Sequence, residues 1–81
     1  VMVAEQNNHR VSIFDLEGNF IKAFGKNGSG PGDFAYPRGI AFDPSARAIL
    51  VADGNNKRIQ IFSEEGDYRD HFATASGPFD V

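Results

Sequence analysis

The chain has 81 residues, of which 41% are hydrophobic and 23% are charged, with a formal net charge of −3 and no cysteine. This length allows at most one small domain, and without cysteine there are no disulfide bonds or thiolate metal ligands to stabilise it. The acidic balance excludes a strongly basic nucleic-acid surface over the whole chain, and no apolar run approaches the roughly 18 residues of a membrane span. The absence of cysteine suits a reducing compartment such as the cytoplasm.

Hydrophobic residues recur with a period of two rather than 3.6, which is typical of strands. Ile59 and Ile61 point to one face of their segment, whereas Gln60 and Phe62 point to the other. Clusters of Gly and Asn interrupt the pattern at short intervals and leave no room for a helix of normal length. We therefore predict strands over residues 1–4, 10–15, 20–24, 38–43, 48–52, 57–62 and 68–72.

Two kinds of connection separate these segments. Glu17-Gly18-Asn19 predicts a tight turn in which the glycine adopts a positive φ. Residues 26–37 are rich in Gly and Pro and predict a longer irregular connection.

The strongest feature of the sequence is an internal repeat. Residues 1–25 align with residues 49–73 at a shift of 48 positions, and ten of these 25 pairs are identical. After a deletion of one residue, Ser29-Gly30-Pro31 matches Ser76-Gly77-Pro78. A fixed period of this size indicates a solenoid, a propeller or another repeat array.

The apolar pattern favours the propeller. Strand 57–62 carries Ile61 on one face and Phe62 on the other, so its sheet must be covered on both faces. Sheets stacked around an axis satisfy this requirement, and the small Ala41 suits an innermost strand near that axis. We predict an all-β fold of β-propeller blades, each with four antiparallel strands, and fewer than two blades in this chain. A β-sandwich is the structural alternative, but it does not explain the repeat.

Several ordered motifs resemble the NHL repeat, a blade motif of β-propellers. They are Pro37-Arg38-Gly39-Ile40-Ala41, Val51-Ala52-Asp53, Asn56-Lys57-Arg58, Ile59-Gln60-Ile61-Phe62 and Glu65-Gly66. The first copy contains Asn8-His9-Arg10, although Ala4-Glu5 replaces the usual Ala-Asp. The resemblance covers nearly the whole chain and is greatest to the C-terminal propeller of tripartite-motif ubiquitin ligases.

The resemblance implies a division of the chain into blades. Residues 1–25 would form strands 2–4 of a partial blade, 26–37 an inter-blade loop, 38–73 a full blade, and 74–81 the start of the next connection. Two blades leave apolar sheet faces bare. We expect the chain to be a piece of a longer protein, or a natural or engineered unit that completes its blades with copies of itself. In the latter case the tail of one copy would supply the missing inner strand of the next.

The candidate site is a surface that we call the loop face. In an NHL propeller, the loop that enters the inner strand and the loop between the second and third strands open on the same side. The resemblance implies that this surface holds single-stranded RNA or a protein partner. Basic side chains can meet phosphates, amides can read base edges, and an aromatic ring offers a stacking plane. The candidate residues are Phe34, Tyr36, Arg38, Asn8, His9, Asn55, Asn56 and Lys57.

A structural role competes with binding at the repeated arginines. Arg10 and Arg58 are expected to pair with Glu5 and Asp53 and to bond loop carbonyls.

No catalytic or metal-binding pattern is present in the sequence. His9 and His71 occupy different repeat positions without nearby thiols, and no serine lies in a Gly-x-Ser-x-Gly elbow. We predict a binding module without a cofactor. Amidating lyases share the repeat and are the enzymatic alternative, but their metal site needs several histidines.

Overall fold

The computed structural model describes residues 1–74, which form seven β-strands and two short 3-10 turns. The predicted connection over residues 74–81 lies outside the described residues except for Thr74. The elements are β1 (Met2–Glu5), η1 (Gln6–Asn8), β2 (Arg10–Phe14), β3 (Phe20–Phe24), β4 (Pro37–Asp43), β5 (Ala48–Asp53), η2 (Gly54–Asn56), β6 (Arg58–Ser63) and β7 (Tyr68–Ala73).

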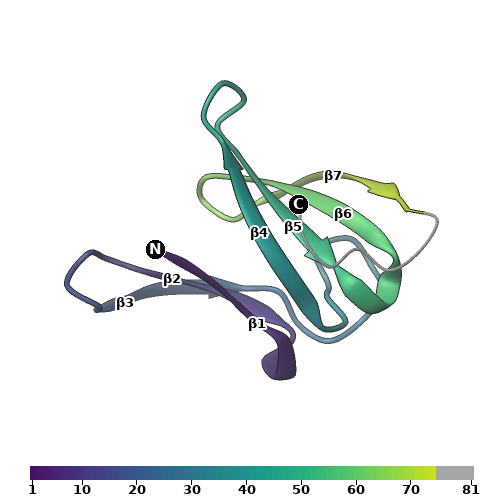
Figure 1. Ribbon diagram of the computed structural model, residues 1–81, viewed down its shortest axis with the longest axis horizontal. Coiled ribbons are helices and arrows are strands. Elements are labelled where there is room, and N and C mark those ends of the chain that lie inside the picture. The colour runs from purple at the N-terminus through teal and green to yellow at the C-terminus, as the bar shows by residue number, and fades with distance from the viewer. Residues whose placement is uncertain (75–81) are drawn as a thin grey trace.

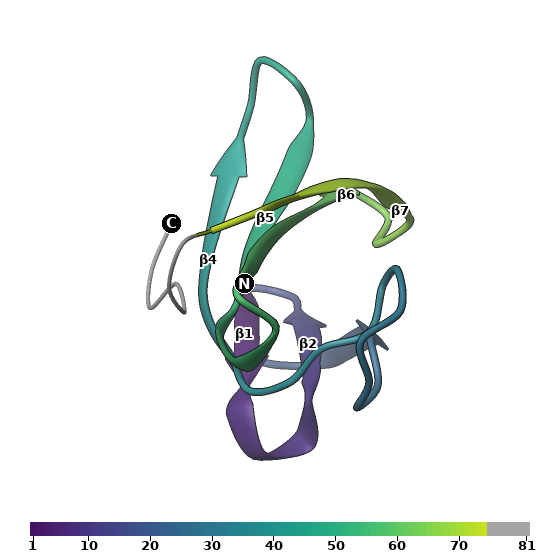
Figure 2. The same ribbon diagram turned by 90° about the vertical axis from the view of Figure 1, so that its right-hand side faces the viewer.

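The strands form two antiparallel sheets, with the order β1-β2-β3 in the first and β4-β5-β6-β7 in the second. Figures 1 and 2 show these sheets as separate bodies that meet where β1 lies beside β4. Each strand lies within one residue of its predicted bounds, and the sheets are those of a partial β-propeller. The predicted all-β propeller fold is therefore confirmed.

The register explains why the second sheet needs cover on both faces. Ile49 pairs with Phe62 and Val51 pairs with Gln60, so these four side chains point to the same face, towards the first sheet. Ile61 pairs with Leu50 and points to the opposite face. The predicted alternation in β6 is confirmed.

The core lies between the two sheets. Its fully buried members are Val11, Phe34, Ile49, Val51 and Phe62, against which Met2, Phe24 and Ile40 pack. Burial of a side chain of this size contributes about 1.5–3 kcal/mol. The fully buried core therefore contains residues of β2 in the first sheet, of β5 and β6 in the second sheet, and of the connection between β3 and β4.

Candidate functional site

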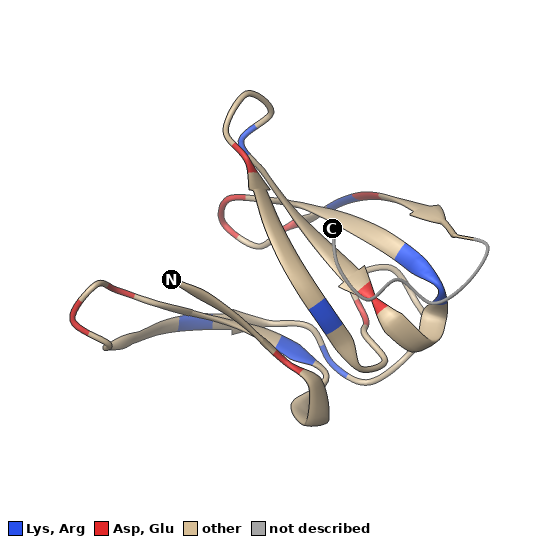
Figure 3. Ribbon diagram, viewed as in Figure 1, with Lys and Arg blue, Asp and Glu red and all other residues tan. Residues whose placement is uncertain are grey.

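The two 3-10 turns and the start of β4 lie along one edge of the molecule, at the bottom of Figure 1. Each turn ends at a left-handed residue, His9 with a φ of 52° and Lys57 with a φ of 54°. Figure 3 shows basic positions at the start of β4 and near the start of β6 on this edge. The repeat therefore places one equivalent turn from each sheet on the same surface.

Tyr36 and His9 form the contact between the two halves of the loop face. The Tyr36 backbone amide donates a hydrogen bond to His9 Nδ1 at 3.1 Å, so Nδ1 is the acceptor nitrogen. Their rings meet edge to face with centroids 4.6 Å apart. Tyr36 also has a left-handed φ of 57°, and 41% of its surface is exposed. An exposed aromatic ring is thus held by a partner from the first sheet.

Arg38 lies over Gly54, the first residue of η2. A Cβ atom placed on Gly54 would lie 2.7 Å from Arg38 Nε and 2.9 Å from the Tyr36 carbonyl oxygen. Only glycine permits this approach without movement of the arginine. The sequence carries one signal for this role, because the first repeat has Gln6 where the second has Gly54.

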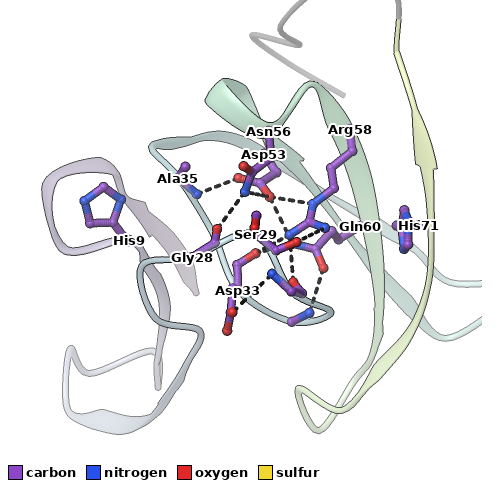
Figure 4. A network of polar contacts seen from close by, with 12 residues as sticks. His9, Gly28, Ser29, Asp33, Ala35, Asp53, Asn56, Arg58, Gln60 and His71 are labelled. Atoms are coloured by element: carbon purple, nitrogen blue, oxygen red, sulfur yellow. Dashed lines mark hydrogen bonds and ion pairs between the residues drawn. The ribbon is translucent and has the colours of Figure 1, made fainter.

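A buried polar network beneath the loop face centres on Asp53 (Figure 4). One carboxylate oxygen accepts from the Ala35 amide at 2.7 Å, and the other accepts from Arg58 Nε at 2.7 Å and from Asn56 Nδ2 at 2.9 Å. The Asp53 side chain is fully buried, and only 9% of the Arg58 side chain is exposed. No buried side-chain nitrogen or oxygen in the described residues lacks a hydrogen-bond partner. Hydrogen bonds therefore compensate both charged groups of the Asp53–Arg58 ion pair for their removal from water.

The same network holds the connection between the sheets through its backbone. Arg58 donates to the carbonyl oxygens of Ser29, Gly30 and Asp33 at 3.0, 2.9 and 2.8 Å. Gln60 accepts from the Gly32 amide at 2.9 Å. The predicted structural role of Arg58 is confirmed, and this role places the segment that carries Tyr36.

The equivalent arginine of the first repeat has fewer partners. Arg10 Nε lies 3.1 Å from Glu5, and 46% of the Arg10 side chain is exposed. Glu5 also accepts from Ser12 and from Asn8 Nδ2. These hydrogen bonds, that from Ser12 above all, lower the pKa of Glu5 from 4.5 to about 2. The predicted ion pair is confirmed, whereas the hydrogen bonds of Arg10 that the structure describes go to Glu5 and none to a loop carbonyl.

One of the predicted loop-face residues is wrong. Phe34 is fully buried because its ring fills the space between Phe24 and Phe62, with centroids 6.3 and 5.5 Å away. Asn56 is half-buried, and its Nδ2 donates to Asp53 and to the Gly28 carbonyl, so the amide nitrogen is used within the protein and a binding role for Asn56 stays a prediction. The predicted residues that the structure leaves at the surface are Asn8, Tyr36, Arg38, Asn55 and Lys57, which are exposed, and His9 and Asn56, which are half-buried.

The described residues contain no group of three or more His, Asp or Glu side chains that could hold a metal ion. Figure 4 shows His9 and His71 on opposite sides of the polar network, so these two rings do not converge. Residues 1–74 form no pocket, and within them no helix has the length and hydropathy required to span a bilayer. The surface that the repeat brings together is open and carries basic, amide and aromatic groups.

Comparison with known proteins agrees with this architecture. A family model described as "6-bladed beta-propeller" matches residues 1–71. A relative in Drosophila melanogaster, "Protein brain tumor", is 44% identical over 41 residues, which is 51% of this chain. The match spans only 4% of that relative's length. With the repeat motifs, these two matches support a propeller of the NHL type.

Proposed function

Because this chain belongs to the family of 6-bladed beta-propellers, we propose that it is a non-catalytic binding module whose loop face holds single-stranded RNA. Its sheets would be successive NHL blades, a partial blade over residues 1–25 and a full blade over 38–73. The predicted location of the protein is the cytoplasm. The group of proteins from which we predict the chain to come is the tripartite-motif ubiquitin ligases.

One observation carries the proposal. Tyr36 is exposed, is fixed in place by His9, and lies beside the arginine that covers Gly54. Base stacking on an aromatic ring and phosphate contacts from nearby cations are the two components of sequence-tolerant binding to single strands. Lys57 and Asn55, both exposed on η2 or directly after it, extend this surface with a second cation and an amide.

A protein partner is the second candidate. The net charge of −3 opposes a polyanion at long range, whereas an exposed tyrosine next to an arginine is common at protein interfaces. The salt dependence of binding separates the two ligands, because phosphate contacts release counterions and weaken steeply as the salt concentration rises.

The test measures the binding of fluorescent single-stranded RNA of mixed sequence by anisotropy at several salt concentrations. Arg38→Ala and Lys57→Ala should each reduce affinity and make the salt dependence shallower by about one phosphate contact. Tyr36→Ala should reduce affinity by about 1–3 kcal/mol through the loss of stacking.

Arg47→Ala is the matched control, because it removes the same charge from an exposed arginine that pairs with Glu64, away from the loop face. RNA affinity that is equal in all four variants and the unaltered chain would contradict the proposal. Binding to a protein with little salt dependence would favour the second candidate.

A further inference from the structure

Tyr36 has a backbone conformation that its sequence context disfavours. Its φ of 57° lies in the left-handed region, which a bulky residue other than glycine rarely adopts. Tyr36 also precedes Pro37, and a residue before proline prefers an extended conformation because the proline ring crowds it. A residue in such a conformation is held there by its surroundings. An extended conformation is therefore available to Tyr36 if a contact that holds it is lost.

The contacts of this segment differ in the sheet that they reach. Ala35 is tied to the second sheet, because its amide donates to Asp53 at 2.7 Å. Pro37 is tied to the same sheet, because it pairs with Asp53 between β4 and β5. Tyr36 lies between them, and its amide donates to His9 Nδ1 of the first sheet at 3.1 Å. The hydrogen bond to His9 thus acts on the residue of this segment that has the left-handed conformation.

This hydrogen bond requires a neutral imidazole at His9. Nδ1 accepts a hydrogen bond only when it carries no proton, so the neutral ring has its proton on Nε2. A second proton makes Nδ1 a donor, and two N–H groups then face each other. Histidine side chains change charge between about pH 5 and 8. His9 is half-buried, so water has access to it.

The other charged groups near His9 keep their charge over this pH range. On the elements that meet at His9 they are Glu5 and Arg10 of the first sheet, Lys26 of the connection after β3, Arg38 of β4, and Asp53 and Lys57 on either side of η2. Glu5 pairs with Arg10, and hydrogen bonds lower the pKa of Glu5 to about 2. Asp53 is buried and pairs with Arg58. Among these groups, His9 is the one whose charge changes near neutral pH.

The second repeat shows the same position without an acceptor. The counterpart of His9 is Lys57, and both residues end a 3-10 turn in the left-handed conformation, with φ values of 52° and 54°. A lysine side chain is a cation with three donors and no acceptor. The turn therefore accommodates a cation at this position without a change of backbone conformation. His9→Lys imitates protonated His9 for the same reason.

We propose that His9 is a pH-sensitive positioning residue of the loop face. Neutral His9 holds Tyr36 in the left-handed conformation that presents its ring for base stacking, and protonated His9 releases Tyr36 towards the extended conformation. Single-stranded RNA then binds more weakly in acid, because a smaller fraction of the molecules has the ring in place. The effect on binding rests on the proposed function, whereas the movement of Tyr36 rests on this geometry alone.

NMR spectroscopy of the isotope-labelled chain tests the movement of Tyr36 without RNA. A scalar coupling across the hydrogen bond, between the Tyr36 amide nitrogen and His9 Nδ1, should be present near pH 8 and absent near pH 5, at the two ends of the range in which histidine titrates. The amide and Cα chemical shifts of Tyr36 should change with the same midpoint as the His9 ring. This shared midpoint would link the backbone movement to the protonation of His9.

Two variants at position 9 isolate the hydrogen bond, because both lack the imidazole ring. His9→Asn should keep Tyr36 in place at every pH. Asparagine Oδ1 lies as many bonds from the backbone as histidine Nδ1, accepts without titrating, and asparagine tolerates a positive φ. His9→Lys should show the released Tyr36 at every pH, because lysine has no acceptor.

Fluorescence anisotropy with the same single-stranded RNA tests the effect on binding. High salt is used because it screens the charge that His9 gains in acid. Acidification from about pH 8 to about pH 5 should weaken binding by the unaltered chain about threefold to tenfold, as for the loss of one hydrogen bond. His9→Asn should bind equally well at both pH values, and His9→Lys should bind weakly at both.

His71→Gln is the matched control for titration. It removes the other histidine of the chain, whose Nδ1 lies 2.6 Å from the Tyr68 hydroxyl group on β7. His71 lies on the opposite side of the polar network from His9 (Figure 4). This variant should keep the full pH response of the unaltered chain. A response that disappears in His71→Gln would contradict the role of His9.

The two measurements separate this proposal from the proposed function. A Tyr36 conformation that is the same at both pH values, or the same in His9→Lys and His9→Asn, would overturn the positioning role of His9 even if RNA binds. RNA that fails to bind at either pH would contradict the proposed function, and the NMR titration would still decide the positioning role. An RNA affinity that stays constant while Tyr36 moves would exclude stacking on Tyr36.

Discussion

At the scale of single residues, the repeat uses the same pair of side chains in two environments. Asp53 and Arg58 are buried under the connection between the sheets, whereas Glu5 and Arg10 remain partly exposed. A second pair of contacts is conserved in geometry: Phe14 meets Phe20 edge to face at 5.9 Å, and Phe62 meets Tyr68 edge to face at 6.1 Å. Residues at equivalent positions of the two repeats therefore contact equivalent partners. The contribution of each pair to the stability of the fold depends on how deeply the pair is buried.

The two arginines should differ in their contribution to stability. Arg58→Ala leaves the fully buried Asp53 carboxylate without its cation and should cost about 3–5 kcal/mol, which is enough to unfold a small domain. Arg10→Ala breaks an exposed pair and should cost about 1 kcal/mol or less. Urea denaturation of both variants measures the difference. Equal unfolding free energies for the two variants would show that the buried network does not stabilise the fold.

Glu5 gives the chain a dependence on pH. Its pKa falls from 4.5 to about 2 on folding through hydrogen bonds from Ser12, Asn8 and Arg10. Because the folded-state pKa is the lower one, Glu5 stabilises the fold fully above pH 4.5 and loses this contribution as the pH falls towards 2. Carbon-detected NMR titration of the carboxyl group should give a midpoint near the lower value in the unaltered chain. Ser12→Ala should raise that midpoint, and an unchanged value would exclude the Ser12 hydroxyl as the main cause.

At the scale of elements, the connection between β3 and β4 acts as a structural part of the core. Phe34 inserts between the two sheets, and Gly25 permits its close approach, since a Cβ atom there would lie 2.3 Å from the ring. Gly25 also has a φ of 100°, a conformation that other residues rarely adopt. One aromatic ring and one glycine thus determine how the connection leaves β3.

Substitution at two glycines separates crowding from backbone strain. Gly25→Ala should destabilise the chain by more than the roughly 1–3 kcal/mol that a strained backbone costs, because the methyl group also displaces the Phe34 ring. Gly18→Ala has a comparable φ of 87° but open space, so it should show only the backbone cost. Thermal unfolding followed by circular dichroism compares the two at one low chain concentration. A smaller loss of stability for Gly25→Ala than for Gly18→Ala would contradict this role of Phe34.

The strands were predictable from the sequence, and parts of the loop face were not. Alternation in segments such as Arg58–Ser63 depends on neighbours two positions apart, which a sequence displays directly. The burial of Phe34 depends on Phe24 and Phe62, which belong to different sheets, so a loop phenylalanine gave no local signal of its environment. The commitment of Asn56 to Gly28 is likewise a long-range contact.

At the scale of the whole molecule, one core holds the two sheets together. Ile49, Val51 and Phe62 of the second sheet are buried in the same cluster as Val11 of the first sheet and Phe34 of the connection between them. Because each sheet buries its apolar residues against the other, the two sheets are expected to unfold together in one transition.

The attachment of the connecting segment to Arg58 has an evolutionary consequence. Arg58 recognises the carbonyl oxygens of Ser29, Gly30 and Asp33, which every amino acid possesses. Side chains at the exposed positions of this segment can therefore diversify by mutation while the backbone stays in register with the sheet. Such substitutions need no compensating change in Arg58, because its hydrogen-bond partners are backbone carbonyl oxygens.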